Sequence, residues 1–184
     1  MVSTPADKVR ARARLFLEEG QLEQALETYA LLTELNSDDM RSLLRIGEIQ
    51  GRLGELQEAS ETFGRVAAIY CSQGAHLKAL AVYKQILTML PERLDIHSTV
   101  AKLYVMLGLV SEATAHRRHL VTIYEGQGRH KECAAVLEEL LEADGEHMAA
   151  RIKLAELYLQ LNDRRLARDH FWAAAKKLLQ SGQL

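Results

Sequence analysis

Two histidines, His116 and His119, are the residues of this chain whose spacing comes nearest to metal chemistry. Side chains three residues apart lie on the same face of an α-helix, so both imidazoles could reach one ion. No carboxylate or cysteine lies at ligand spacing beside them to complete a site. We favour a solvated polar helix face for the run His116-Arg117-Arg118-His119, and we expect no metal and no cofactor.

The motifs of common catalytic sites are missing from the sequence. It has no glycine-rich phosphate loop, no Cys-x2-Cys pair and no His-Glu-x2-His. The two cysteines, Cys71 and Cys133, are too few for a disulfide framework and indicate free thiols in a reducing compartment. We therefore expect a protein that is not an enzyme.

The charge of the chain argues against nucleic acid as its partner. Its 23 Lys and Arg residues and 25 Asp and Glu residues give a formal net charge of −2, whereas a duplex usually selects a basic face. The short basic run from Lys8 to Arg14 alternates with Val9 and Ala13, which belong to the apolar stripe of an ordinary amphipathic helix. No apolar run approaches the roughly 18 residues that cross a bilayer. The N-terminus also lacks the apolar run of a signal peptide, so we expect a cytoplasmic protein without membrane insertion.

A small motif, glycine followed five positions later by alanine, recurs along the chain. In one copy cysteine replaces the alanine, and in another asparagine replaces the glycine; both are common substitutes. The copies are Gly20…Ala25, Gly54…Ala59, Gly74…Ala79, Gly108…Ala113, Gly128…Cys133 and Asn162…Ala167. Steps of 34 and 20 residues alternate between the alanine positions, so the true period is 54.

The steps of 34 residues and the residues around them resemble the tetratricopeptide repeat (TPR) family. Matches to its consensus include Leu43-x2-Ile46-Gly47, Ala59-x3-Phe63 and Ala79-x3-Tyr83. Arg117 and Gln50 depart from the aromatic and tyrosine columns of that consensus. The resemblance implies an all-α, TPR-like α-solenoid of about ten antiparallel helices that form a right-handed superhelix, as a single domain over residues 1–184.

A step of 20 residues is about one helix shorter than a regular repeat. We therefore predict that 56–73 and 110–127 are each one continuous helix that closes one repeat and opens the next. The alanines Ala59 and Ala113 should be buried where these helices cross their neighbours. The ten helices are expected at about 6–19, 22–35, 39–53, 56–73, 76–90, 93–107, 110–127, 130–143, 147–161 and 164–180.

In the family that this chain resembles, the first helix of each pair lines a concave groove that holds a partner protein. Carried over to this sequence, the groove positions are Arg41, Leu44, Glu48, Arg52, Asp95, Ser98, Lys102, Met106, Ala149, Ile152, Glu156 and Gln160. The joining helices would add Arg10, Arg14, Arg118 and Glu125. Their mixed charge suits an amphipathic helix or an extended peptide of scattered charge.

Two functions follow from this interpretation. The first is a protein–protein interaction module, an adaptor or scaffold, that works in a bacterial assembly, secretion or motility system. The alternative is a structural element that self-associates by stacking its terminal helices into a homo-oligomer, because the terminal segments keep apolar residues such as Leu178 and Leu179.

Overall fold

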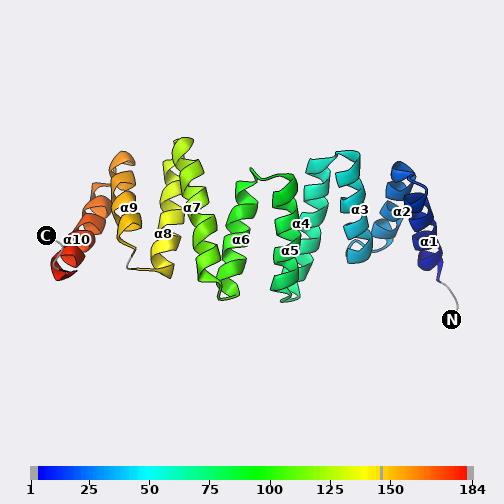
Figure 1. The fold of residues 1–184 in the computed structure, drawn as a ribbon, viewed down its shortest axis with the longest axis horizontal. Coiled ribbons are helices and arrows are strands. Elements are labelled where there is room, and N and C mark those ends of the chain that lie inside the picture. The colour runs from blue at the N-terminus through cyan, green and yellow to red at the C-terminus, as the bar shows by residue number, and fades with distance from the viewer. Residues whose placement is uncertain (1–3, 146, 182–184) are drawn as a thin grey trace. The chain divides into compact units, whose positions relative to one another are not determined.

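Ten α-helices and no strand make up the part of the chain that this computed structural model describes, residues 4–145 and 147–181 (Figure 1). The helices are α1 (Pro5–Glu18), α2 (Leu22–Leu35), α3 (Met40–Leu53), α4 (Leu56–Ser72), α5 (His76–Met89), α6 (Leu94–Met106), α7 (Val110–Gly126), α8 (His130–Ala143), α9 (Met148–Gln160) and α10 (Arg164–Ser181). All ten expected helices are present, with ends within a residue or two of those expected.

The recurring glycines end helices in the left-handed conformation. Backbone φ is +82° at Gly54 and +64° at Asn162, where most side chains would be strained. The amide N–H of the next residue donates to the carbonyl five positions back, as from Glu55 to Gln50 at 2.9 Å. This bond is typical of a glycine that closes a helix and reverses the chain. The same bond recurs after Gly20, Gly74, Gly108, Gly128 and Asn162.

The joints before α3 and α9 are built differently. Asp39 accepts a hydrogen bond from the backbone N–H of Ser42 and caps α3, and His147 does the same for Ala150 and caps α9. A side-chain cap at these joints satisfies a backbone donor that the helix itself leaves free. After the capped joint before α3, two joints in succession have a left-handed residue, at Gly54 and Gly74, and two more, at Gly108 and Gly128, precede the capped joint before α9.

The two segments expected as single helices are continuous. Both α4 and α7 span 17 residues without a break. Gly64 lies inside α4 and does not interrupt it. Ala59 and Ala113 are fully buried, as predicted for residues at helix crossings.

The chain divides into two compact units, Met1–Ile96 and His97–Leu184. In the first unit α1 packs against α2, α2 against α3, α3 against α4, and α4 against α5. In the second, α7 packs against α8, α8 against α9, and α9 against α10. Large apolar side chains such as Tyr29, Phe63 and Leu154 are almost completely buried between them. The single domain expected over residues 1–184 stays a prediction.

Polar residues replace the family's aromatic side chains at two inner positions. The buried Arg117 donates from Nε to Glu139 Oε2 at 3.1 Å, so its charge is paired on α8. Gln50 accepts a hydrogen bond from the hydroxyl of Thr62 at 2.8 Å. Hydrogen bonds at these two sites therefore join neighbouring helices where an aromatic ring packs in the consensus.

None of the helices in the described part of the chain is both long enough and apolar enough to cross a bilayer.

Candidate functional site

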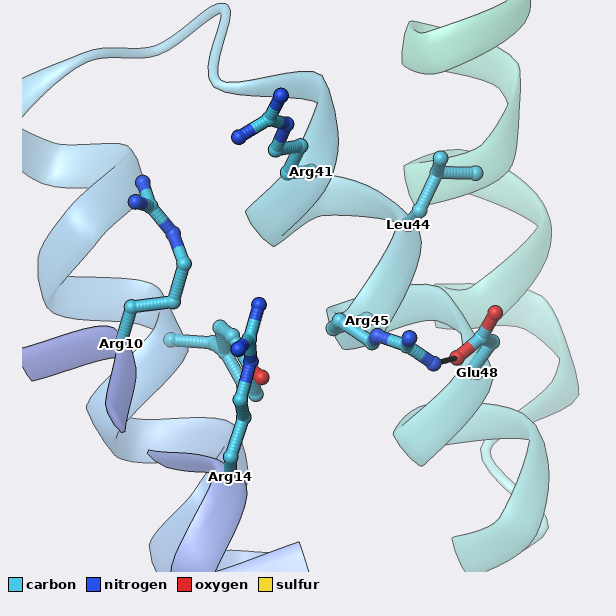
Figure 2. Close-up of a pocket in the computed structure, with 7 residues that line it drawn as sticks. Arg10, Arg14, Arg41, Leu44, Arg45 and Glu48 are labelled. Atoms are coloured by element: carbon cyan, nitrogen blue, oxygen red, sulfur yellow. Dashed lines mark hydrogen bonds and ion pairs between the residues drawn. The ribbon is translucent and has the colours of Figure 1, made fainter. Parts of the chain in front are cut away.

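A hollow of about 220 Å³ lies between α1, α2 and α3 in the first unit (Figure 2). Its lining residues are Arg10, Arg14, Tyr29, Arg41, Leu44, Arg45 and Glu48. Five of the predicted groove residues are therefore brought together here, three from α3 and two from α1. Sequence reasoning missed Arg45, although it follows Arg41 by four residues and so lies on the same helix face.

The charges of this hollow are only partly neutralised. Arg10 pairs with Asp39 at 3.0 Å and with Asp7 at 3.4 Å. Arg45 pairs with Glu48 at 2.6 Å, as Figure 2 shows. Arg14 and Arg41 form no ion pair with any described residue. Two guanidinium groups that carry unused donors thus face one hollow, which favours an anionic group there.

Asp39, the residue that caps α3, also binds Arg10, which lines this hollow. Burial raises the pKa of Asp39, but hydrogen bonds from Ser42 and Arg10 lower it by more, so this carboxyl has a pKa below its ordinary value. Asp39 stays ionised at neutral pH and holds the Arg10 side chain at 3.0 Å. Arg10 is thereby held at the edge of the hollow with its charge paired, which leaves Arg14 and Arg41 as the guanidinium groups of the hollow that are unpaired among the described residues.

A second hollow, of about 420 Å³, opens further along α3. Leu56, Phe63 and Met89 give it apolar walls from α4 and α5. Its α3 side is lined by Gly47, Glu48, Gly51 and Arg52, and Gln85 completes it. Glu48 lines both hollows, so they are neighbours beside α3. We call the two hollows together the α3 groove.

Part of the predicted groove in the second unit lies around another hollow, of about 190 Å³. Its lining includes the expected Glu125, Glu156 and Gln160, together with Lys153, His130 and Leu157, which were not expected. Lys153 pairs with Glu125 at 2.6 Å and neutralises it. This hollow therefore mixes both signs of charge and has less apolar lining than the α3 groove.

The remaining predicted positions are not gathered around these hollows. Asp95 is engaged by Arg93 at 2.7 Å, and Arg118 lies 3.2 Å from the Nε2 atom of His147. Lys102 and Met106 are exposed on α6. Ser98 and Ile152 are half-buried, and Ala149 is exposed.

The histidines considered for metal chemistry do come together, with a third that sequence reasoning missed. His97 Nδ1 lies 3.0 Å from His116 Nδ1, and the His97 and His119 rings are 4.8 Å apart. Across the described residues, however, no group of three or more histidine, cysteine or carboxylate side chains is placed to hold a metal ion. His97 comes from α6, nineteen residues from His116 in sequence, and no motif links the two.

Comparisons with solved structures return repeat proteins of low sequence identity. YrrB, described as a TPR protein with an unusual peptide-binding site, is 17% identical over 100% of both chains, with a TM-score of 0.38. MamA from Desulfovibrio magneticus RS-1 is 17% identical over 98% of both chains, with a TM-score of 0.35. A tetratricopeptide repeat protein from Parabacteroides merdae is 19% identical over 95% of this chain and 79% of its own, with a TM-score of 0.32. No curated protein matches the sequence.

The match to a family model identifies the family of this chain, which the structural similarities, at 19% identity or less, do not. A tetratricopeptide repeat model matches residues 10–74 and 120–179, which together make up more than half of the chain. These ranges contain α2, α3 and α4 of the first unit and α8 and α9 of the second. On this evidence the chain belongs to the tetratricopeptide repeat family.

Proposed function

We propose that this protein is a non-catalytic adaptor or scaffold that binds a peptide or helix of a partner protein in the α3 groove. The supporting observation is the convergence of Arg10, Arg14, Arg41, Leu44 and Glu48 on one hollow. Those positions were expected to face a partner from the resemblance alone. The proposed setting is a bacterial assembly, secretion or motility system in the cytoplasm.

The chemistry of the groove suits a peptide better than a small substrate. Peptide-binding surfaces combine a few charged donors with apolar pockets for anchoring side chains. The α3 groove has both, with arginines in one hollow and Leu56, Phe63 and Met89 in the other.

Site-specific photo-crosslinking tests the proposal. A photoreactive amino acid at Leu44, which lines the groove, should crosslink a partner in cells of the native host. The same amino acid at Leu77, 66% exposed on α5 and outside both hollows, serves as the matched control. Equal crosslinking at both positions, or a partner attached only through Leu77, would place the binding surface elsewhere.

A second candidate function, self-association, is favoured by the surface of α10. Trp172 and Leu179 are 73% and 66% exposed, and seven residues separate them, so they lie on one face of the helix. Large exposed apolar side chains on one face are typical of contact surfaces. Light scattering tests this function, because an oligomer that a W172K/L179K variant converts to a monomer would support it. A wild-type monomer at high concentration would count against it.

A further inference from the structure

The two hollows of the α3 groove differ in chemistry, and that difference specifies what binds there. We propose that the groove takes a bipartite segment, with acidic side chains at one end and a large apolar side chain at the other. The acidic end lies against Arg14 and Arg41, and the apolar end lies between Leu56 and Met89. This inference rests on the proposed function and names the chemistry of the partner.

The arginine end carries a surplus of two positive charges. Of its four arginines, Arg10 and Arg45 already have carboxylate partners at 3.0 Å and 2.6 Å. Arg14 and Arg41 have none among the described residues, and both are exposed. Each guanidinium can receive one carboxylate through two parallel hydrogen bonds, so two neighbouring acidic side chains match the surplus.

The hydroxyl of Tyr29 can add a further donor. The Tyr29 side chain is almost completely buried but lines this hollow, and no described residue hydrogen-bonds to its hydroxyl. A donor held rigidly by a buried ring loses little conformational freedom on binding. A carboxylate near the floor of the hollow can therefore be contacted from two sides.

The other end offers an apolar side chain the surfaces of Leu56 and Met89, with Glu48 and Arg52 on the α3 side. Leu56 is 37% exposed and Met89 is half-buried, so both have apolar surface that a partner can cover. On the α3 side, the Phe63 ring covers Gly47 and the Met89 sulfur lies near Gly51, so apolar side chains rather than polar ones lie against these glycines. Methionine adapts its shape to different partners, which suits it to such a pocket.

Glu48 separates the two ends and sets the order of the motif. It lines both hollows and is held by Arg45 at 2.6 Å. An acidic residue in the middle of the bound segment would lie against the Arg45–Glu48 pair, whose charges cancel, whereas one at the arginine end would meet the unpaired Arg14 and Arg41 and be favoured. The groove thus selects the position of acidic residues as well as their number.

Selection from a displayed library of random peptides on the full chain tests this inference. Peptides that bind the wild type should share acidic residues at one end and a leucine, isoleucine, methionine or phenylalanine at the other. Synthetic peptides of that consensus are then titrated by fluorescence polarisation against variants whose helix content is checked by circular dichroism. The variant R14Q/R41Q should bind them about tenfold or more weakly, because both unpaired guanidinium groups are lost.

Two further variants separate the specific contacts from general effects. M89Q keeps the length of the side chain and should remove the preference for an apolar residue while it leaves the acidic preference. R12Q removes an arginine of the same helix, α1, that lines neither hollow of the groove, and should change affinity less than about twofold.

The outcomes distinguish this inference from the function on which it rests. Peptides that bind without an acidic end, or that R12Q weakens as much as R14Q/R41Q does, would overturn the bipartite motif and leave peptide binding intact. A library from which the wild type selects nothing, together with no crosslink at Leu44, would overturn both.

Discussion

Small residues at helix crossings set how closely the helices of this protein pack. Ala59 and Ala113 are fully buried in the joining helices. Gly47 lies against the ring of Phe63, where a Cβ atom would come within 2.9 Å of two ring carbons. Space at these sites is so limited that single added carbon atoms should have measurable effects.

Replacing Ala59 with leucine should lower the free energy of unfolding by roughly 1–3 kcal/mol, because the larger side chain overpacks the crossing. Urea denaturation measures this change. The matched control is Ala68→Leu, which lies on the exposed face of the same helix and should stay within about 0.5 kcal/mol of wild type. Equal midpoints for the two variants would show that Ala59 is not at a crossing.

Two glycine-to-alanine substitutions should have opposite signs. In α4, an added Cβ at Gly64 meets nothing within 4 Å, so Gly64→Ala should raise stability by about 0.5–1 kcal/mol through helix propensity. In α3, the same change at Gly47 presses on the buried ring of Phe63 and should lower stability despite that propensity. Thermal melting of both variants checks the signs, and stabilisation by Gly47→Ala would mean that the ring moves aside at little cost.

At the scale of whole elements, the residues at the helix ends determine how the chain turns from one helix into the next. Left-handed residues follow the ends of α1, α3, α4, α6, α7 and α9, and side-chain caps begin α3 and α9. A left-handed end reverses the chain within two or three residues, so the next helix packs alongside the previous one. Helix ends are therefore the elements where substitutions should change both stability and geometry.

At the end of α3, Gly54→Ala should destabilise the protein by about 1–2 kcal/mol, because alanine is strained at a φ of +82°. Gly54→Asn should cost less, since asparagine already occupies the equivalent position at Asn162 with a φ of +64°. Chemical denaturation of the two variants gives the comparison. An alanine variant as stable as the asparagine variant would contradict the role of the left-handed end.

The cap of α3 should make stability depend on acid. Asp39 has a pKa below its ordinary value, so its ionised form stabilises the fold above the unfolded-state pKa, and this contribution is lost as pH falls through the folded-state value. Asp39→Ala should cost about 1 kcal/mol at neutral pH. The difference from wild type should shrink as pH falls below the ordinary aspartate pKa of about 3.9, because the unfolded chain then takes up the proton before the folded one does.

Urea titrations at several pH values follow that difference. The neighbouring Asp38 caps no helix, so Asp38→Ala provides a control with the same loss of charge. A cost for Asp39→Ala that is constant across the acid range would exclude the ionised carboxyl as its cause.

For the whole molecule, stability should be distributed along the array of helices. Each helix of the first unit packs mainly on its sequence neighbours, and the same is true in the second. In such arrays stability is close to a sum of local terms between adjacent elements. The effect of a core substitution should then fade with distance along the chain.

Hydrogen exchange tests this with a substitution in the first unit. Phe63→Leu removes part of a buried ring in α4 and should speed amide exchange most in α3, α4 and α5. Amides of α8 and α9 should change little. Uniform acceleration across both units would show that the chain unfolds as one cooperative body.

The sequence by itself determined the helices, their ends and most of their buried faces. These features depend on local patterns: a spacing of three or four residues for a buried stripe, and glycine or asparagine where φ must be positive. The continuity of α4 and α7 and the burial of Ala59 were accordingly predicted correctly. Family resemblance also named Arg41, Leu44 and Glu48, three residues of α3 that line one hollow together.

Tertiary structure alone decided which of those faces meet. The pairing of Arg117 with Glu139, the approach of His97 to His116 and the place of Met89 in the α3 groove join residues of different helices. Periodicity gives the direction in which a side chain leaves its own helix, but not how neighbouring helices are displaced and rotated. A few ångströms of such displacement determine whether two arginines share a hollow, because contacts between side chains form only at short range.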